Sequence, residues 1–248
     1  MSEESKDILI LKISSISTEQ VLYFLGVRHT NSPVDIQFVQ LEKFWNEFLS
    51  SSRRDRIVFT EGSVREVPLS YEDSIKQRGE VGASQWLAYK ANSMCVCPEP
   101  TNEEQRKALC LFFDPQNVAY ALIVQNLAAW YNYSRQSDFN EVLFKSINRE
   151  IKFSSIYGFV ANNSWFYNQH KKLFSEQQLS DREFLQSISD PRKNDTIVNT
   201  IVAFRTKIRN EYLLSAIKKA WELGKDIFVV YGRGHLDALE KELGKIID

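Results

Sequence analysis

The sequence has few cysteines. Three occur in 248 residues, and none of them forms the Cys-x-x-Cys pair that a zinc knuckle requires. An odd number of cysteines in a chain of this length also argues against a disulfide framework. Cys95, Cys97 and Cys110 are therefore interpreted as buried thiols in a reducing compartment.

Neither an excess of charge nor a long hydrophobic run is present. The 31 basic and 32 acidic residues give a net charge of −1, which does not favour nucleic acid or an anionic membrane as a partner. The longest apolar stretch, Val118 to Tyr131, is interrupted by Gln125 and Asn126. It is shorter than the roughly 20 apolar residues of a membrane span. The first residues also lack a signal-peptide pattern. We therefore predict a cytoplasmic protein that acts on a small molecule or a peptide.

Linkers, repeats and nucleotide-binding motifs are missing as well. No stretch rich in proline, glycine or serine divides the chain, so one domain over residues 1–248 is predicted. No Gly-x-Gly-x-x-Gly follows the first predicted strand, and there is no P-loop. The composition, 43% hydrophobic and 25% charged, is that of an ordinary globular protein with a substantial core.

Strand-like and helix-like segments alternate along the chain. Runs of β-branched residues predict strands at about 8–13, 20–25, 56–60, 94–97 and 227–231, with the first two paired as a hairpin. Periodicity and capping residues predict helices after Ser32-Pro33, within 71–91, from Thr101, from Asp114 to about Tyr133, from about 195 to Gly224, and over 236–247. The pattern predicts an α/β fold with a mainly parallel sheet covered by helices, and a helical insertion at about 114–190.

Polar residues follow four of the predicted strands. Gly26-Val27-Arg28-His29 comes after the second strand and Gly232-Arg233-Gly234-His235 after the last, while Glu61 and Glu99 follow the two strands between them. Two of the three histidines thus occupy the same Gly-x-x-His arrangement. Ligands of α/β proteins bind beyond the carboxyl ends of strands, so these residues predict one site.

Imidazole and carboxylate side chains together suit both hydrolysis and metal binding. A histidine can bind a metal or transfer a proton, and a carboxylate can complete a metal shell or act as a general base. We predict His29, Glu61 and His235 as ligands of a divalent metal, manganese, cobalt or zinc, among which the sequence does not choose. The alternative is that each Gly-x-x-His is only the turn that begins a helix.

Further residues are predicted to support this site. Glu80 lies between Gly79 and Gly82, whose cost in a helix indicates close backbone packing or a helix start. Gly26, Arg28, Glu99 and Gly232 are predicted to contact the substrate or to support the catalytic residues. Arg209, on a long helix, could stabilise negative charge or simply be a solvated surface arginine.

His170 is the remaining histidine. It lies in the polar segment Asn168-Gln169-His170-Lys171-Lys172. We therefore expect its side chain to be exposed.

The residues above resemble a superfamily that includes the TraB/PrgY pheromone-shutdown proteins, the Tiki proteases, the ChaN-type haem-binding lipoproteins and the erythromycin esterases. The matching segments are Leu25-Gly26-Val27-Arg28-His29, Glu61, Arg209-Asn210-Glu211-Tyr212-Leu213 and Val229 to Leu236, with a weaker match from Gly79 to Pro100. The resemblance implies an α/β core with helical insertions. It also implies His29, Glu61, Arg209 and His235 as catalytic residues, and its members include metal-dependent peptidases, metal-independent esterases and haem binders.

These observations predict a hydrolase that cleaves a peptide, amide or ester bond. Glu61 and one histidine would activate water, with or without a metal, while Arg209 and the other histidine would stabilise the oxyanion. The alternative is a non-catalytic protein that uses the same pocket to bind an anion, a tetrapyrrole or a partner protein. A fold-level resemblance does not decide between them.

Overall fold

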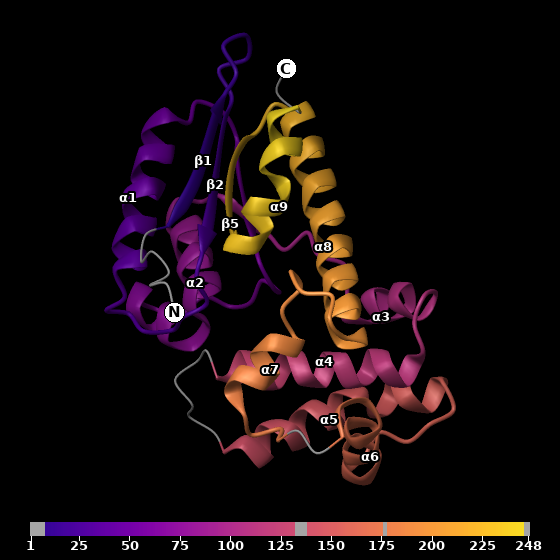
Figure 1. Ribbon diagram of the computed structural model, residues 1–248. Helices are drawn as coiled ribbons and strands as arrows, with labels where there is room; N and C mark the ends of the chain where they lie inside the picture. The colour runs from indigo at the N-terminus through magenta and orange to yellow at the C-terminus, as the bar shows by residue number, and fades with distance from the viewer. Residues whose placement is uncertain (1–7, 132–137, 176–177, 246–248) are drawn as a thin grey trace. The chain divides into compact units, whose positions relative to one another are not determined.

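The chain has the predicted α/β fold. A computed structural model describes residues 8–131, 138–175 and 178–245, and contains a five-stranded, mostly parallel sheet with helices around it (Figure 1). The chain forms two compact units, one of residues 1–99 with 209–248 and one of residues 100–208. No helix among the described residues is both long and apolar enough to cross a membrane.

The first unit contains the whole sheet. Its strands are β1 (Leu9–Ser14), β2 (Val21–Val27), β3 (Arg56–Thr60), β4 (Met94–Val96) and β5 (Asp226–Gly232). The spatial order is β1-β2-β5-β3-β4, with β1 antiparallel to β2 and all other neighbours parallel. The last strand of the chain therefore lies between β2 and β3. Since these strands run in the same direction, the loops that follow them emerge at one end of the sheet.

Helices cover both faces of this sheet (Figure 1). On one face, α1 (Ile36–Ser51) and α2 (Tyr71–Lys90) bury every second residue of the strands, such as Tyr23 and Leu25 of β2. On the other face, the carboxyl-terminal part of α8 (Ile197–Glu222) and α9 (Arg233–Gly244) bury the alternate residues, such as Leu22 and Phe24. Because both faces are covered, β2 and β5 are buried along their whole length, as their continuous apolar sequences require.

The second unit is helical. It contains α3 (Asn102–Cys110), α4 (Pro115–Trp130), α5 (Phe139–Ile156), α6 (Asn163–Phe174), α7 (Arg182–Ile188) and the first part of α8. Its core surrounds α4, in which every residue from Val118 to Val124 is buried. This helical unit extends beyond the predicted insertion at both ends. The single domain over 1–248 remains a prediction.

Helix ends follow the capping signals with two exceptions. Thr101 and Glu104 form the expected capping box, Asp114 caps α4, and Gly224 has the positive φ of 73° expected after a helix. The predicted start of α1 at Ser32-Pro33 is wrong, because Asp35 accepts a hydrogen bond from the amide of Gln37 and is the N-cap.

The predicted start of the last helix is also too late. It begins at Arg233, so His235 lies in the first turn of α9 and not in a loop. The predicted ends near Tyr133 and Ile247 lie outside the described residues.

The prediction that His170 is exposed is wrong. Its side chain is buried, and its Nδ1 lies 2.6 Å from the hydroxyl of Tyr120. The four-residue spacing of Phe166, His170 and Phe174 places them on one face of α6, where the three rings pack with Tyr120 of α4. The polar neighbours in the sequence concealed this apolar face.

Candidate functional site

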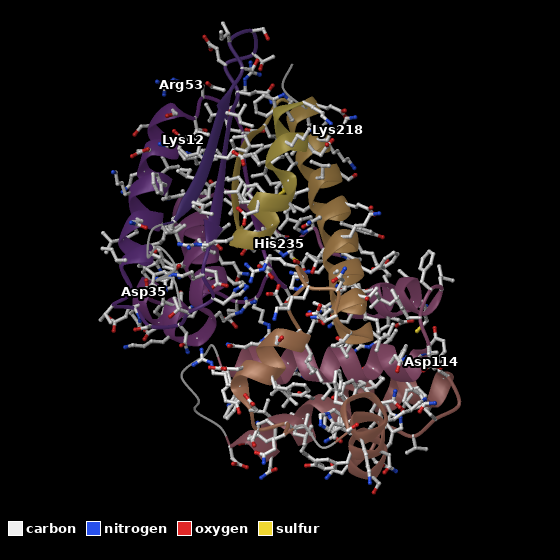
Figure 2. All side chains as sticks on the ribbon, in the orientation of Figure 1. Lys12, Asp35, Arg53, Asp114, Lys218 and His235 are labelled. Carbon is white, nitrogen blue, oxygen red and sulfur yellow. The ribbon has the colours of Figure 1, made fainter. Side chains whose placement is uncertain are left out.

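Five of the predicted residues meet at the carboxyl end of the parallel strands, within the first unit. His29 follows β2, Glu61 follows β3, Glu99 follows β4, and His235 follows β5 at the start of α9, where Figure 2 labels it. Arg209 reaches the same place from α8. The central position of β5 is the reason, because it sets the loop after the last strand beside the loops after β2 and β3.

Glu61 lies at the centre of this cluster, and both of its oxygens accept hydrogen bonds. Oε1 accepts from Nη2 of Arg209 at 2.6 Å, and Oε2 accepts from the amide of Gly232 at 3.0 Å. The same Nη2 donates to Oε1 of Glu99 at 2.5 Å. One buried guanidinium therefore holds two carboxylates, and its charge is shared between them.

His29 is supported from behind by Glu80. Its Nδ1 lies 2.6 Å from Oε1 of Glu80, whose side chain is 3% exposed. Glu80 reaches this position because α2 is kinked at Gly79, whose φ of 57° and ψ of −135° interrupt the helix. A Cβ at Gly79 would lie 2.4 Å from the carbonyl oxygen of Thr30, so the loop that carries His29 packs directly on the kink. The glycines around Glu80 thus mark close backbone packing, as the sequence predicted.

His235 is supported by an amide side chain instead. Its Nδ1 lies 2.5 Å from Oδ1 of Asn210, the residue next to Arg209 on α8. Both side chains are buried. The ring also packs edge-on against Tyr231, with 5.3 Å between the ring centroids. Consecutive residues of one helix therefore hold Glu61 and His235.

The second nitrogen of each imidazole points toward Glu61 without bonding to it. Nε2 of His29 lies 3.8 Å from Oε2 of Glu61, and Nε2 of His235 lies 3.9 Å from Oε1. These distances exceed a direct hydrogen bond and suit groups bridged by a water or a reacting atom. A Cβ at Gly232 would stand 3.1 Å from Nε2 of His29 and 3.4 Å from Oε2 of Glu61. The absence of a side chain at Gly232 leaves room beside Nε2 of His29 and Oε2 of Glu61, and we call this position the seat.

The two histidines differ in protonation. Partial burial disfavours the imidazolium of His29, whose side chain is 40% exposed, but its hydrogen bond to Glu80 and the charge of Glu61 outweigh this effect and raise its pKa to about 9. Burial lowers the pKa of His235 to about 4, and the charges of Arg209 and His29 add to this against the opposing effect of Glu61. At neutral pH one imidazole is therefore charged and the other neutral.

Glu61 remains ionised between them. Burial favours its neutral acid, but the charge of Arg209 and the two imidazoles hold the pKa of Glu61 well below its usual range. Opposite shifts in neighbouring groups are typical of sites that divide acid and base roles.

Several polar atoms of the cluster are buried without a partner. Among the described residues these are Oε2 of Glu80, Nε of Arg209 and the hydroxyl of Tyr231. A buried polar atom without a hydrogen bond costs about 1–3 kcal/mol, so three in one cluster are unusual if the cluster is purely structural. These unpaired atoms could form hydrogen bonds to a polar ligand, as expected of a binding site.

Two predicted residues lie away from the seat. The guanidinium of Arg28 pairs with Asp35 at 2.9 Å and 3.1 Å, where it fixes the loop to the start of α1. Gly26 faces α9, and a Cβ there would lie 3.2 Å from a side-chain carbon of Leu236. Its small size lets α9 pack closely on β2. Both residues support the site indirectly.

The predicted metal ligands do not form one coordination set as they stand. No group of three or more His, Cys, Asp or Glu side chains in the described part of the chain is arranged to hold a metal ion. Both oxygens of Glu61 already accept hydrogen bonds, and a protonated His29 has no free lone pair. Glu80 and Asn210 do support the imidazoles as partners of metal ligands would. The metal therefore remains a prediction.

Sequence reasoning gave no role to Asn210 or Tyr231. A signal for Asn210 exists, because it shares the helical face of Leu213 and Ile217, both fully buried. A polar residue on an apolar helical face needs a partner, and here the partner is His235. Tyr231 ends an apolar strand and carries no comparable signal.

Comparisons of this chain with protein families, with curated proteins and with solved structures gave no match, so the chemistry of the site rests on its own geometry.

Proposed function

We propose that the protein is a hydrolase that cleaves a peptide, amide or ester bond in the seat between His29 and His235. One observation carries this proposal. Nε2 of each imidazole lies 3.8 Å or 3.9 Å from an oxygen of the same carboxylate, and the surroundings of the two rings shift their pKa values in opposite directions. A neutral and a charged imidazole across one small space are suited to accept a proton on one side and to stabilise negative charge on the other.

The neutral His235 and Glu61 activate the water. With Nδ1 bonded to the oxygen of Asn210, His235 carries its proton on Nδ1, and Nε2 offers a lone pair. A water in the seat would donate one hydrogen to this nitrogen and the other to Glu61. As the water oxygen attacks the carbonyl carbon, its proton passes to Nε2 of His235.

His29 and Arg209 stabilise the product of that attack. The electron pair of the carbonyl bond moves to oxygen, and the Nε2 proton of His29 and the guanidinium lie beside the seat. When the carbonyl bond re-forms, the leaving oxygen or nitrogen departs with the proton held by His235. Water and substrate yield an acid and an alcohol or amine, so atoms and charges balance.

The same residues support the family proposal. His29, Glu61, Arg209 and His235 are the residues on which the resemblance to the TraB/PrgY, Tiki and erythromycin esterase superfamily rests, and they cluster in the structure. A divalent metal bound by His29, Glu61 and His235 would polarise water or the carbonyl. The proton transfer to His235 and the charge stabilisation by His29 and Arg209 described above do not require this metal.

The test is a hydrolysis screen with p-nitrophenyl esters and peptide p-nitroanilides, with and without manganese, cobalt, zinc or a chelator. We expect turnover that His29→Ala and His235→Ala each reduce about 10²–10⁴-fold, because each removes one proton-transfer or charge-stabilising group. Thermal unfolding and circular dichroism establish that both variants stay folded. Activity that survives either change contradicts the proposal. Binding of a ligand without any turnover would favour a non-catalytic binding protein.

A further inference from the structure

Three buried glutamines of the first unit bond to the backbone of connecting segments. Gln37, Gln85 and Gln20 are 2%, 3% and 3% exposed. The side-chain amide of each donates a hydrogen bond to a backbone carbonyl of another segment of the chain. Gln37 and Gln85 bond to the loops that carry His29 and Glu61. Gln20 precedes β2 and bonds at the opposite end of the sheet.

Gln37 holds the residue before His29 by both of its backbone groups. Oε1 of Gln37 accepts from the amide of Arg28 at 3.1 Å, and Nε2 donates to the carbonyl oxygen of Arg28 at 2.9 Å. These are the two bonds that a neighbouring strand makes to one residue of a sheet. Gln37 therefore fixes the chain after β2 has ended at Val27.

Gln85 holds the loop after Glu61 in a similar way. Its Nε2 donates to the carbonyl oxygen of Ser63 at 3.2 Å, and its Oε1 accepts from the amide of Arg65 at 3.4 Å. Arg78 of the same helix donates to Oε1 of Gln85 at 2.9 Å and to the carbonyl oxygen of Ser63 at 2.7 Å. The loop that carries Glu61 is thus bonded to α2 through its backbone.

Gln20 makes comparable bonds away from the seat. Its Nε2 donates to the carbonyl oxygens of Trp221 at 2.9 Å and Lys225 at 3.1 Å, in the segment that leads into β5. Its burial equals that of Gln85. The chain therefore contains its own control for a buried glutamine that bonds to backbone.

We infer that Gln37 and Gln85 are positioning residues that fix His29 and Glu61 at the seat through the backbone of the loops that carry them. A displacement of a reacting group by about 1 Å can reduce a rate roughly 100-fold, so fixed loops have a direct effect on catalysis. The catalytic part of this inference rests on the proposed hydrolase function. The fixing of the two loops does not.

The test replaces each glutamine by methionine, which has a similar length but no amide. We expect Gln37→Met, Gln85→Met and Gln20→Met each to lower the melting temperature by about 2–10 °C, because each leaves buried backbone groups without a partner. Only the first two should lower kcat, about 10–100-fold, with KM changed less than about threefold. A merely structural role would affect stability in all three and kcat in none.

Hydrogen exchange, followed for single amides by NMR, tests the loops without any substrate. The amide of Arg28 should exchange about 5–30-fold faster in Gln37→Met, and that of Arg65 in Gln85→Met, since each loses its acceptor. Neither amide should change in Gln20→Met.

A conservative variant provides a rescue. Gln85→Glu keeps an oxygen acceptor for Arg78 and for the amide of Arg65, and Arg78 still bonds to Ser63. We expect Gln85→Glu to retain most of the kcat that Gln85→Met loses. A loss of kcat as large as in Gln85→Met would contradict the positioning role of this acceptor.

The remaining outcomes separate the inference from the proposed function. Equal loss of kcat in all three methionine variants, or unchanged exchange at Arg28 and Arg65, would overturn the inference. Faster exchange with unchanged kcat would overturn its catalytic part and leave the hydrolase in place. Faster exchange in a protein that hydrolyses no substrate would support the fixing of the loops and contradict the hydrolase.

Discussion

Asp226, fully buried, and Glu61, whose side chain is 15% exposed, are carboxylates at opposite ends of the same sheet, and their surroundings differ. Asp226, at the start of β5, is fully buried and accepts four hydrogen bonds, from the amides of Val21, Arg53 and Arg54 and the hydroxyl of Ser52. From the described residues Glu61 accepts two, and its neighbours include buried polar atoms without partners there.

The contrast separates stability from function. Asp226 ties the start of β5 to the start of β2 and to the end of α1, and every donor around it is used. At the other end, Nε2 of His29 and Nε2 of His235 lie 3.8 Å and 3.9 Å from Glu61, beyond a direct hydrogen bond. Residue type and position at a strand end do not distinguish the two carboxylates. The completeness of their hydrogen bonding does.

The largest expected effect is on stability. Asp226→Ala should lower the free energy of unfolding by about 3–5 kcal/mol, because four donors, the buried amide of Val21 among them, lose the charged acceptor that they share. Urea unfolding measures this change. Asp226→Asn, which keeps one oxygen, should cost less. Loss of hydrolysis in Asp226→Ala without loss of stability would contradict the conclusion that Asp226 stabilises the fold and takes no part in the reaction.

A smaller effect should distinguish two glycines of the same turn. Gly232→Ala puts a methyl group into the seat, 3.1 Å from Nε2 of His29, whereas a Cβ at Gly234 meets nothing within 4 Å. We expect Gly232→Ala to reduce kcat/KM about 10–100-fold, roughly 1.4–2.7 kcal/mol, with little change in stability. Gly234→Ala is the matched control and should keep wild-type kinetics. Equal effects of Gly232→Ala and Gly234→Ala on kcat/KM would mean that the reaction does not take place beside Gly232.

The smallest effect concerns pH. Activity requires a neutral His235 and a protonated His29, so kcat/KM should fall as pH drops through about 4 and as it rises through about 9. Between these values it should be nearly constant. Rate profiles in buffers of constant ionic strength measure both limbs. A single transition near pH 6.5, the ordinary pKa of histidine, would mean that the surroundings of His29 and His235 do not shift the pKa values that control the rate.

The sequence predicted the elements better than their ends. Apolar runs such as Ile227 to Tyr231 read as strands because burial on both faces leaves no polar alternation. Local capping chemistry does not locate the start of α1, because Ser32 and Asp35 are both acceptable caps; in the structure Asp35 caps the helix and also pairs with Arg28. The burial of His170 depends on Tyr120, fifty positions away in the chain, which no local pattern indicates.

The sequence by itself determined the α/β class and the strand ends that carry polar residues, since these depend on local periodicity; around Glu80 it left close backbone packing and a helix start as alternatives, and the structure shows the packing. Only the tertiary structure decided that β5 lies between β2 and β3, which brings His29 and His235 to one carboxylate. It also decided which ring is charged. Protonation depends on the partner behind each imidazole, and no local pattern specifies a partner that comes from another element of the fold.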